Sequence, residues 1–228
     1  MRVCNLASGS AGNCTYVEGD ETKILVDCGL TIHDLSARLG MLGVTIDDID
    51  AVVVSHEHID HIKSVATLSK KYNKKIYAYV DEWQAILAKQ SNVNPVNQMA
   101  FFELPFEIGK IKITPIKLPH DSFSCFGFCF EQNDKKFSIL TDLGQTNDRI
   151  LSSRGHLSNV ASAKAIEKLS GYGTKQVVLS HLSEKNNTPE LAFNTVCTYL
   201  DERGIKQGEN IRIDIARQDR PTTIFNLR

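Results

Sequence analysis

The stretch SHEHIDH, residues 55–61, contains the side chains that most often bind metal ions in proteins. His56, His58, Asp60 and His61 fall within six consecutive positions. Imidazole nitrogens and carboxylate oxygens are ligands of Zn²⁺, Mn²⁺ and iron ions. A hydrophobic core has little use for so many polar rings in one turn, because each buried ring nitrogen needs a partner. The stretch therefore predicts a metal site.

Other metal-competent residues follow strand-like segments elsewhere in the chain. Asp27 ends TKILVD, His120 follows IKITPIKLP, Asp142 ends FSILTD and His181 follows QVVLS. The carboxyl ends of neighbouring strands meet at one rim of an α/β sheet, where ligands commonly bind. One histidine after a strand is usually an ordinary surface residue, but these four residues together with SHEHIDH favour a shared site.

The number of candidate ligands predicts two metal ions. Five histidines and two or three aspartates exceed the four positions of a tetrahedral site. Two ions about 3.5–4 Å apart can share a carboxylate and a hydroxide and stabilise a displacement at phosphorus. Mixed imidazole and carboxylate ligation suits Zn²⁺, Mn²⁺ or iron and does not decide among them.

Hydrophobic periodicity indicates the elements that would position these residues. The predicted strands are 13–19, 22–29, 50–55, 75–80, 109–118, 125–132, 135–142, 175–180, 211–216 and 222–227. The predicted helices are 30–42, 62–72, 81–90, 158–169 and 188–204. Two β-rich halves, each followed by alternating strands and helices, predict one α/β domain over residues 1–228. We expect a four-layered αβ/βα sandwich of two mixed β-sheets flanked by helices.

Composition limits the partners and the compartment. The 228 residues are 42% hydrophobic and carry a net charge of −1, so a polyanion would have to bind a local basic patch. The six cysteines form no C-x-x-C pair, and several lie in strand-like runs, which is typical of reduced buried thiols. The chain shows no signal-peptide segment and no bilayer-spanning apolar run, so we expect a cytoplasmic protein without a membrane partner.

SHEHIDH, with Asp27 before it and His120, Asp142 and His181 after it, resembles the metallo-β-lactamase fold superfamily. The finer resemblance is to the YycJ/WalJ branch of bacterial nuclease-like hydrolases. It rests on a series of motifs in order along the chain: LASGSAGNC, SHEHIDHIKS, LPHDS, TDLG, RGHLSN and LSHLSEKNNTPELAF.

The resemblance implies a role for each candidate residue. It implies that the first metal ion is bound by His56, His58 and His120. The second metal ion would be bound by Asp60, His61 and His181. Asp142 would bridge the ions, and Asp27 would orient a ligand through a hydrogen bond. Common zinc β-lactamases place a cysteine at the bridging position, so Asp142 resembles the phosphodiesterase and thioesterase branches instead.

His156, in RGHLSN, resembles an extra histidine of the nuclease branches, which would contact the scissile phosphate or protonate the leaving oxygen. The alternative is that His156 only caps or covers the helix that starts at Ser158. In this interpretation Asp60, Asp142 and His156 would be the catalytic residues.

Two further sets of residues are candidates for substrate contact. Ser10, Gly12 and Asn13 lie in SGSAGN, whose backbone amides could bind an anion, although such a segment is usually only a turn. Basic residues that could contact phosphate are Lys63, the cluster KKYNKK at 70–75, Arg149, Arg154 and Lys185. The alternative for the cluster is an ordinary solvated surface.

The sequence departs from the resembled branch after Asp142. Only 13 residues separate Asp142 from His156, where the branch carries a longer stretch with a further buried strand. Either the chain has a true deletion, or a disordered segment near Asp148 and Arg149 is missing, and the well-matched flanks favour the second. A sandwich with this gap would leave backbone groups beside Asp142 without a strand partner.

The function that these observations predict is a phosphodiesterase with two divalent ions, Mn²⁺ or Zn²⁺. The resemblance implies a 5′-to-3′ DNA exonuclease, with an RNA-processing nuclease as a close alternative. A thioester hydrolase with the same metal pair is a second alternative. A third is a non-enzymatic binding module with structural metal ions, although a structural site is closed and needs only four ligands.

Overall fold

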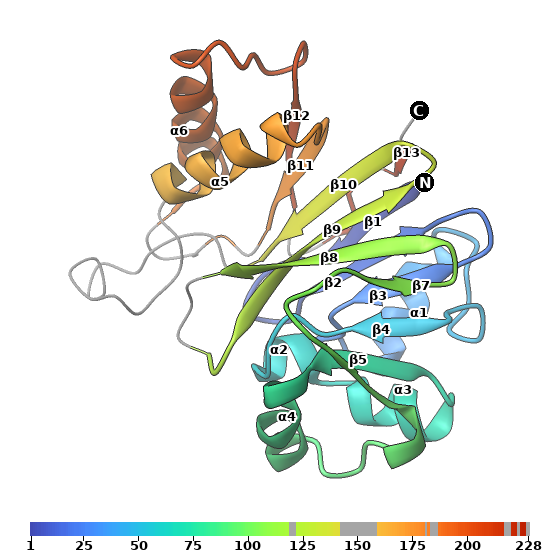
Figure 1. Ribbon diagram of the computed structural model, residues 1–228. Coiled ribbons are helices and arrows are strands. Elements are labelled where there is room, and N and C mark those ends of the chain that lie inside the picture. The colour runs from blue at the N-terminus through green and yellow to red at the C-terminus, as the bar shows by residue number, and fades with distance from the viewer. Residues whose placement is uncertain are drawn as a thin grey trace.

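Two β-sheets stacked between two layers of helices form the computed structural model of the chain (Figure 1). The structure describes residues 1–118, 122–141, 159–180, 182, 187–216, 220–222 and 224–226. Three separate hydrophobic clusters mark a four-layered order: one between helices and the first sheet, one between the sheets, and one between the second sheet and helices. The predicted sandwich is confirmed.

The first sheet has the strand order β13-β1-β2-β3-β4-β5-β6. Its strands are β1 (Arg2–Ala7), β2 (Cys14–Glu18), β3 (Lys23–Val26), β4 (Ala51–Val53), β5 (Lys75–Tyr79), β6 (Gln98–Phe101) and β13 (Phe225–Asn226). Strands β3 to β6 run parallel, so the segments that follow them leave from one edge. The helices packed on this sheet are α1 (Ile32–Gly40), α3 (Val65–Lys71) and α4 (Trp83–Lys89).

The predicted helix over 62–72 is wrong in its boundaries. The chain instead forms the short helix α2 (Ile59–Ile62), then α3. Ser64 separates the two helices, because its hydroxyl donates to the carbonyl oxygen of Leu30 and its backbone N–H donates to that of Cys28. This break holds α2 against the end of β3.

The second sheet has the order β12-β11-β10-β9-β8-β7. Its strands are β7 (Phe106–Ile108), β8 (Ile111–Leu118), β9 (Cys125–Gln132), β10 (Lys135–Leu140), β11 (Gln176–Leu179) and β12 (Arg212–Ile215). The helices beside it are α5 (Asn159–Gly171) and α6 (Pro189–Asp201). Alternate residues of β9, Phe126, Phe128 and Phe130, point between the sheets and are fully buried. This alternation is the pattern of a strand with two different faces.

The part of β10 that the structure describes has a strand partner before Asp142. Strand β10 pairs in parallel with β11, with Ser138 to Leu140 opposite Val177 to Leu179. Asp142 lies outside the described residues, so the prediction about the backbone groups beside it stays a prediction. The junction between Asp148 and Arg149 lies outside the described residues.

Candidate metal centre

The motif HEHIDH, residues 56–61, follows β4 and runs into α2. We call these six residues the metal loop. Strand β4 is buried on both faces, between the helix-side cluster and the inter-sheet cluster. The segment with His56 and His61 therefore begins at a buried strand, and both side chains are 0% exposed. The His56 ring centroid lies 4.1 Å from that of His61 and 4.6 Å from that of His58. The structure thus brings the three predicted histidine ligands together.

Asp27 fixes the orientation of His61. It follows β3, which pairs with β4, so its carboxylate lies beside the start of the metal loop. Oδ1 accepts from the Ser55 backbone N–H at 2.8 Å, and Oδ2 accepts from the Ser55 hydroxyl at 2.9 Å and from His61 Nδ1 at 2.8 Å. A histidine whose Nδ1–H is held by a carboxylate keeps its lone pair on Nε2, the usual arrangement of a metal ligand.

Ser55 extends this order to His56. Its hydroxyl donates to Asp27, and His56 Nδ1 lies 2.9 Å from the same oxygen, so the His56 Nδ1–H is the donor there. Nε2 is then the unprotonated nitrogen of His56 as well. One buried carboxylate and one hydroxyl therefore set the tautomer of two predicted ligands.

The side-chain amide of Asn13 contacts both Asp60 and His61. Its Nδ2 lies 3.1 Å from Asp60 Oδ2 and 3.0 Å from His61 Nε2, and these two atoms are 3.5 Å apart. Its Oδ1 accepts from the backbone N–H of Gly9 at 2.9 Å. An amide nitrogen can only donate, which agrees with an unprotonated Nε2. Asn13, predicted as a substrate contact, is buried, and its side chain lies beside two predicted ligands.

The glycines beside the loop allow backbones to approach closely. A Cβ on Gly29 would lie 1.5 Å from the carbonyl oxygen of Asp60, and a Cβ on Gly12 would lie 2.6 Å from that of Gly29. Close packing is thus one reason for the glycine at position 12, which we had predicted as part of an anion site. Ser10, from the same predicted set, is exposed.

The second sheet meets the metal loop at one edge. The carboxyl-terminal ends of β8, β10 and β11 and the start of β9 lie at the same end of the sheet. The reason is that β9 is antiparallel to β8 and β10, and β11 is parallel to β10. The backbone N–H of Phe126 donates to the Ser55 carbonyl at 3.1 Å, and Cys125 Sγ lies 3.9 Å from His56 Nδ1. Some predicted site residues lie outside the described residues: His120, Asp142, Arg154, His156, His181 and Lys185.

The described donors fit divalent metal ions in their chemistry. His56, His58, Asp60 and His61 provide imidazole and carboxylate groups, and Asp27 supplies the orienting hydrogen bond. Within the described residues, no group of three or more His, Cys, Asp or Glu side chains is placed so that it could hold a metal ion. The ligand set therefore stays a prediction, and its other members lie outside those residues.

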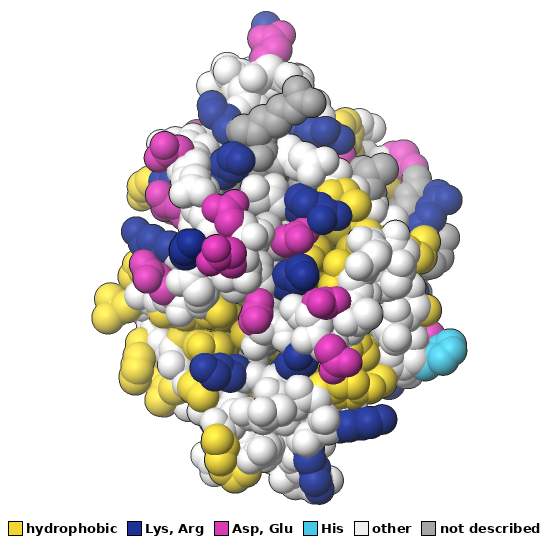
Figure 2. Space-filling model, turned by 90° about the vertical axis from the view of Figure 1, so that its right-hand side faces the viewer, with side chains coloured by type: hydrophobic (Ala, Val, Ile, Leu, Met, Phe, Trp, Pro, Cys, Tyr) yellow, Lys and Arg dark blue, Asp and Glu magenta, His cyan; other side chains and the backbone are white. Residues whose placement is uncertain are grey.

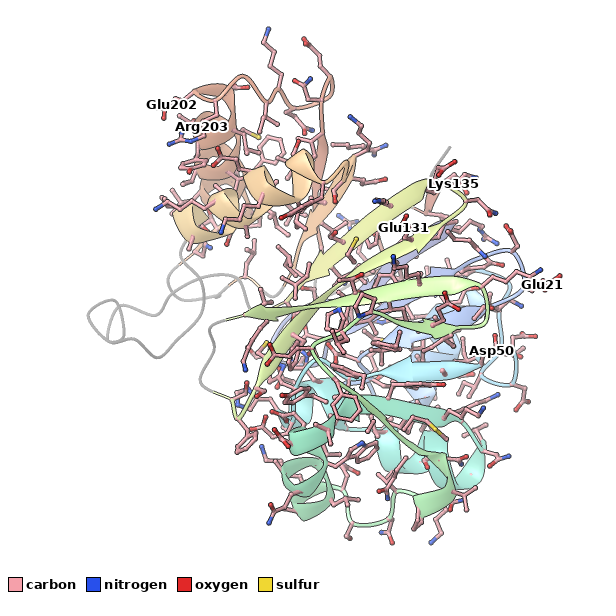
Figure 3. All side chains as sticks on the ribbon, in the orientation of Figure 1. Glu21, Asp50, Glu131, Lys135, Glu202 and Arg203 are labelled. Atoms are coloured by element: carbon pink, nitrogen blue, oxygen red, sulfur yellow. The ribbon has the colours of Figure 1, made fainter. Side chains whose placement is uncertain are left out.

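The basic cluster KKYNKK does not share the rim of the metal loop. Lys75 pairs in register with Ala51, at the start of β4, whereas the metal loop follows the end of that strand. Lys63, in contrast, directly follows α2 and is exposed. Charged residues such as Glu21, Asp50 and Lys135 mark the end of the molecule away from α2 (Figure 3).

Sequence reasoning missed two residues beside the metal loop. Ser55 was part of the quoted motif but received no role, although a hydroxyl directly before a histidine ligand was a usable signal. Glu82 lies in DEWQAILAKQ, which predicted only the acidic start of a helix. No pattern in the sequence shows that its side chain is buried near residue 57.

Comparison with known proteins gives consistent matches over nearly the whole chain. The family model "Metallo-beta-lactamase superfamily" matches residues 7–181. Exodeoxyribonuclease WalJ of Streptococcus pneumoniae is 31% identical over 259 residues, covering 97% of this chain and 96% of the relative. Exodeoxyribonuclease YycJ of Bacillus anthracis is 31% identical over 255 residues, covering 96% of each chain. Both alignments are longer than the 228 residues of this chain, so the relatives carry residues without a counterpart here.

Solved structures show the same fold at low sequence identity. The metallo-beta-lactamase fold protein YhfI from Bacillus subtilis superposes with a TM-score of 0.70 at 17% identity, covering 99% of this chain and 100% of that one. The short form of human tRNase Z gives a TM-score of 0.65 at 15% identity and covers 100% of both chains.

Proposed function

The chain belongs to the metallo-beta-lactamase superfamily, and from this premise we propose that it is a two-metal exonuclease that degrades DNA from the 5′ end. It is a metal-dependent hydrolase, as its nearly full-length exodeoxyribonuclease relatives indicate. The observation that carries the proposal is the buried Asp27–Ser55 pair, which holds the Nδ1–H groups of His56 and His61 and so leaves Nε2 unprotonated, as a metal ligand requires. A hydrogen-bonded carboxylate behind a histidine is the usual support of a metal ligand.

The residues of this chain would divide the work of phosphodiester hydrolysis. His56, His58, Asp60 and His61 would hold the ions, together with His120, Asp142 and His181. When bound, two divalent ions supply Lewis-acid chemistry that offsets charge on the phosphate oxygens. Asp27 keeps the imidazole of His61 in one tautomer and one orientation. His156 would protonate the leaving oxygen, and the metal would be Mn²⁺ or Zn²⁺.

Nucleic acid is the substrate class that the relatives support. Besides the two exodeoxyribonucleases, a ribonuclease Z of Methanopyrus kandleri is 42% identical over 53 residues, but these cover only 23% of this chain. DNA is therefore favoured over RNA.

No described helix of the structure is long and apolar enough to span a membrane.

One face of the molecule carries charges of both signs. Figure 2 shows the right-hand side of Figure 1, where basic and acidic side chains alternate without a large patch of one sign. Such a mixed surface offers no continuous track for a phosphate backbone. Lys63, which follows α2, and Lys89, whose Nζ lies 3.2 Å from the Glu57 carbonyl oxygen, are described lysines next to the metal loop.

Nuclease assays with separately labelled ends test the proposal. Chelator-stripped protein would be given Mn²⁺ or Zn²⁺ and incubated with single-stranded DNA, double-stranded DNA or RNA labelled at either end. We expect early release of the 5′ label from DNA, and no release by Asp60→Ala. Asp34→Ala, which removes an exposed carboxylate on α1, should cleave like the wild type. A protein that binds two ions yet cleaves no polymer, or that hydrolyses small thioesters instead, would refute the proposal.

A further inference from the structure

A groove of about 550 Å³ lies between α5 and the outer face of the second sheet. Figure 1 shows α5 beside β10 and β11, with no described helix over β7 and β8. Strands β8, β9 and β10 form the floor of the groove, and α5 forms one wall. None of the lining residues belongs to the metal loop. Small-molecule sites commonly have volumes of about 300–1,000 Å³, so the groove has the size of a ligand site.

The floor of the groove changes from polar to apolar along the strands. At one end Glu131 and Lys136 pair in register, and their side chains form an ion pair at 3.4 Å. The next row contains Cys129 and its register partner Thr114. The rows after it contribute apolar side chains to the groove, those of Ile116, Leu118 and Leu140. A ligand in the groove would therefore meet charge at one end and hydrocarbon at the other.

One face of α5 forms the wall. Its lining residues lie three or four positions apart, as neighbours on a helix surface do: Ala161, Lys164, Ala165, Lys168 and Leu169. The hydroxyl of Thr174, shortly after α5, lies 3.5 Å from that of Ser138, whose partner in register is Cys129. This contact places the end of α5 beside the polar half of the floor, and Lys168 lies in the last turn of α5.

The two lysines of the wall have no carboxylate partner in the part of the chain that the structure describes. Lys164 and Lys168 are exposed and four positions apart, so their charges repel on one helix face. Glu167 lies between them in the sequence, but it accepts from the hydroxyl of Tyr199 at 3.0 Å and pairs with Arg203. The other lysines that line the groove are paired with glutamates, Lys117 with Glu103 and Lys136 with Glu131. The groove thus carries two uncompensated positive charges.

We propose that this groove binds a single-chain amphipathic anion of the class of medium-chain fatty acids. The carboxylate lies between Lys164 and Lys168, and the hydrocarbon chain lies on Ile116 and Leu140. A nucleic-acid strand matches the groove poorly, because it carries a charge at every nucleotide and the groove has its charge at one end. The site is distinct from the metal loop, so it goes beyond the proposed nuclease activity.

Isothermal titration calorimetry with octanoate, decanoate and dodecanoate, each below its micelle concentration, tests the proposal. We expect saturable one-to-one binding that tightens by up to about fourfold for each added methylene. Acetate lacks the chain and dodecyltrimethylammonium carries the opposite charge, so neither should bind.

Alkylation of cysteines locates the bound ligand. Cys129 lines the groove whereas Cys197, on α6, does not, and both are half-buried. Mass spectrometry after treatment with N-ethylmaleimide should show that decanoate slows the reaction of Cys129 and leaves that of Cys197 unchanged. Protection of Cys129 by a DNA oligonucleotide, without protection by decanoate, would assign the groove to nucleic acid and overturn the proposal.

Substitutions on α5 separate the effect of charge from that of space. The double variant Lys164→Gln, Lys168→Gln retains good helix formers and should bind decanoate about three- to tenfold more weakly. Ala165→Leu fills the groove and should weaken binding at least about tenfold. The control Lys70→Gln, Lys71→Gln removes two exposed lysines from α3, on the first sheet, and should bind like the wild type.

Thermal unfolding shows which variants are folded, and if Ala165→Leu is not, the lysine variant and its control decide the test. Absence of binding by all three carboxylates, binding that does not depend on chain length, or equal affinities of the lysine variant and its control would overturn the proposal. The readout is carboxylate binding, so a protein that binds decanoate but cleaves no DNA would contradict only the proposed function.

Discussion

Asp27 concentrates three hydrogen bonds of the metal centre on one carboxylate. It takes a positive φ of 61°, a conformation that asparagine also tolerates. Asp27→Asn should therefore keep the backbone while removing the charge that holds the Nδ1–H of His61. We expect the dissociation constant for Mn²⁺ or Zn²⁺ to rise by about 10- to 100-fold, measured by chelator competition.

The matched control is Asp34→Asn, on the exposed first turn of α1. Asp34 hydrogen-bonds with Thr31 and lies outside the metal centre. This variant should bind metal like the wild type. Equal affinities for Asp27→Asn and the wild type would show that the carboxylate does not tune the ligands.

Individual residues were predictable where their position alone indicates a role. Asp27 ends an apolar strand-like run, and the spacing of His56, His58 and His61 is sufficient to indicate a metal site. The positions of Ser55 and Glu82 differ in this respect. Their contacts, with Asp27 and with Ser124, depend on which strands lie side by side and on the connection before β9, and these long-range contacts leave no periodic trace in the sequence.

At the level of elements, α2 and the segment after β3 pack backbone to backbone. The Cys28 N–H donates to the His61 carbonyl at 2.7 Å, and the Cβ of an alanine at position 29 would overlap the Asp60 carbonyl. Gly29→Ala must displace α2 or the segment after β3. We expect a loss of about 1–3 kcal/mol in the free energy of unfolding, measured by urea denaturation, together with weaker metal binding.

Gly40→Ala is the corresponding control at the end of α1. A Cβ there meets no atom within 4 Å, and alanine favours the helix, so the free energy of unfolding should stay the same or rise by up to about 1 kcal/mol. Similar destabilisation by both substitutions would mean that the close approach at Gly29 is not the cause.

The elements themselves were predicted better than their pairing. The sequence CFGFCFEQ predicted strand β9. Its alternate phenylalanines lie on one face of that strand, between the sheets. The direct pairing of β10 with β11 was not predicted. It joins three residue pairs in parallel register, Ser138 to Leu140 with Val177 to Leu179, which are far apart in the sequence.

At the level of the whole molecule, the buried side chain of Glu82 links stability to pH. The pKa of Glu82 is raised from 4.5 to about 8 by burial and by Glu57, with Lys89 opposing the shift. The folded state then binds a proton that the unfolded chain releases, so the contribution of Glu82 to stability is greatest below about pH 4.5 and falls as pH rises to about 8. The slope from this group is at most about 1.4 kcal/mol per pH unit.

Comparison with Glu82→Gln isolates this contribution from other titrating groups. Denaturant unfolding of both metal-free proteins across this pH range should show a steeper decline for the wild type. Parallel curves for the two proteins would show that Glu82 titrates alike in the folded and unfolded states.

The two ends of the molecule should differ in their contribution to nucleic-acid binding. Lys63 follows α2 beside the metal loop. Lys75 lies at the start of β5, at the opposite end of the parallel strands from the metal loop. Both side chains are exposed, so Lys63→Glu and Lys75→Glu are matched charge reversals. If DNA crosses the metal rim, only Lys63→Glu raises KM and lowers the slope of log affinity against log salt, by about 0.7–0.9 for one lost phosphate contact. Equal effects would mean that long-range charge, and not the metal rim, governs the encounter, and a thioester substrate would leave both variants unchanged.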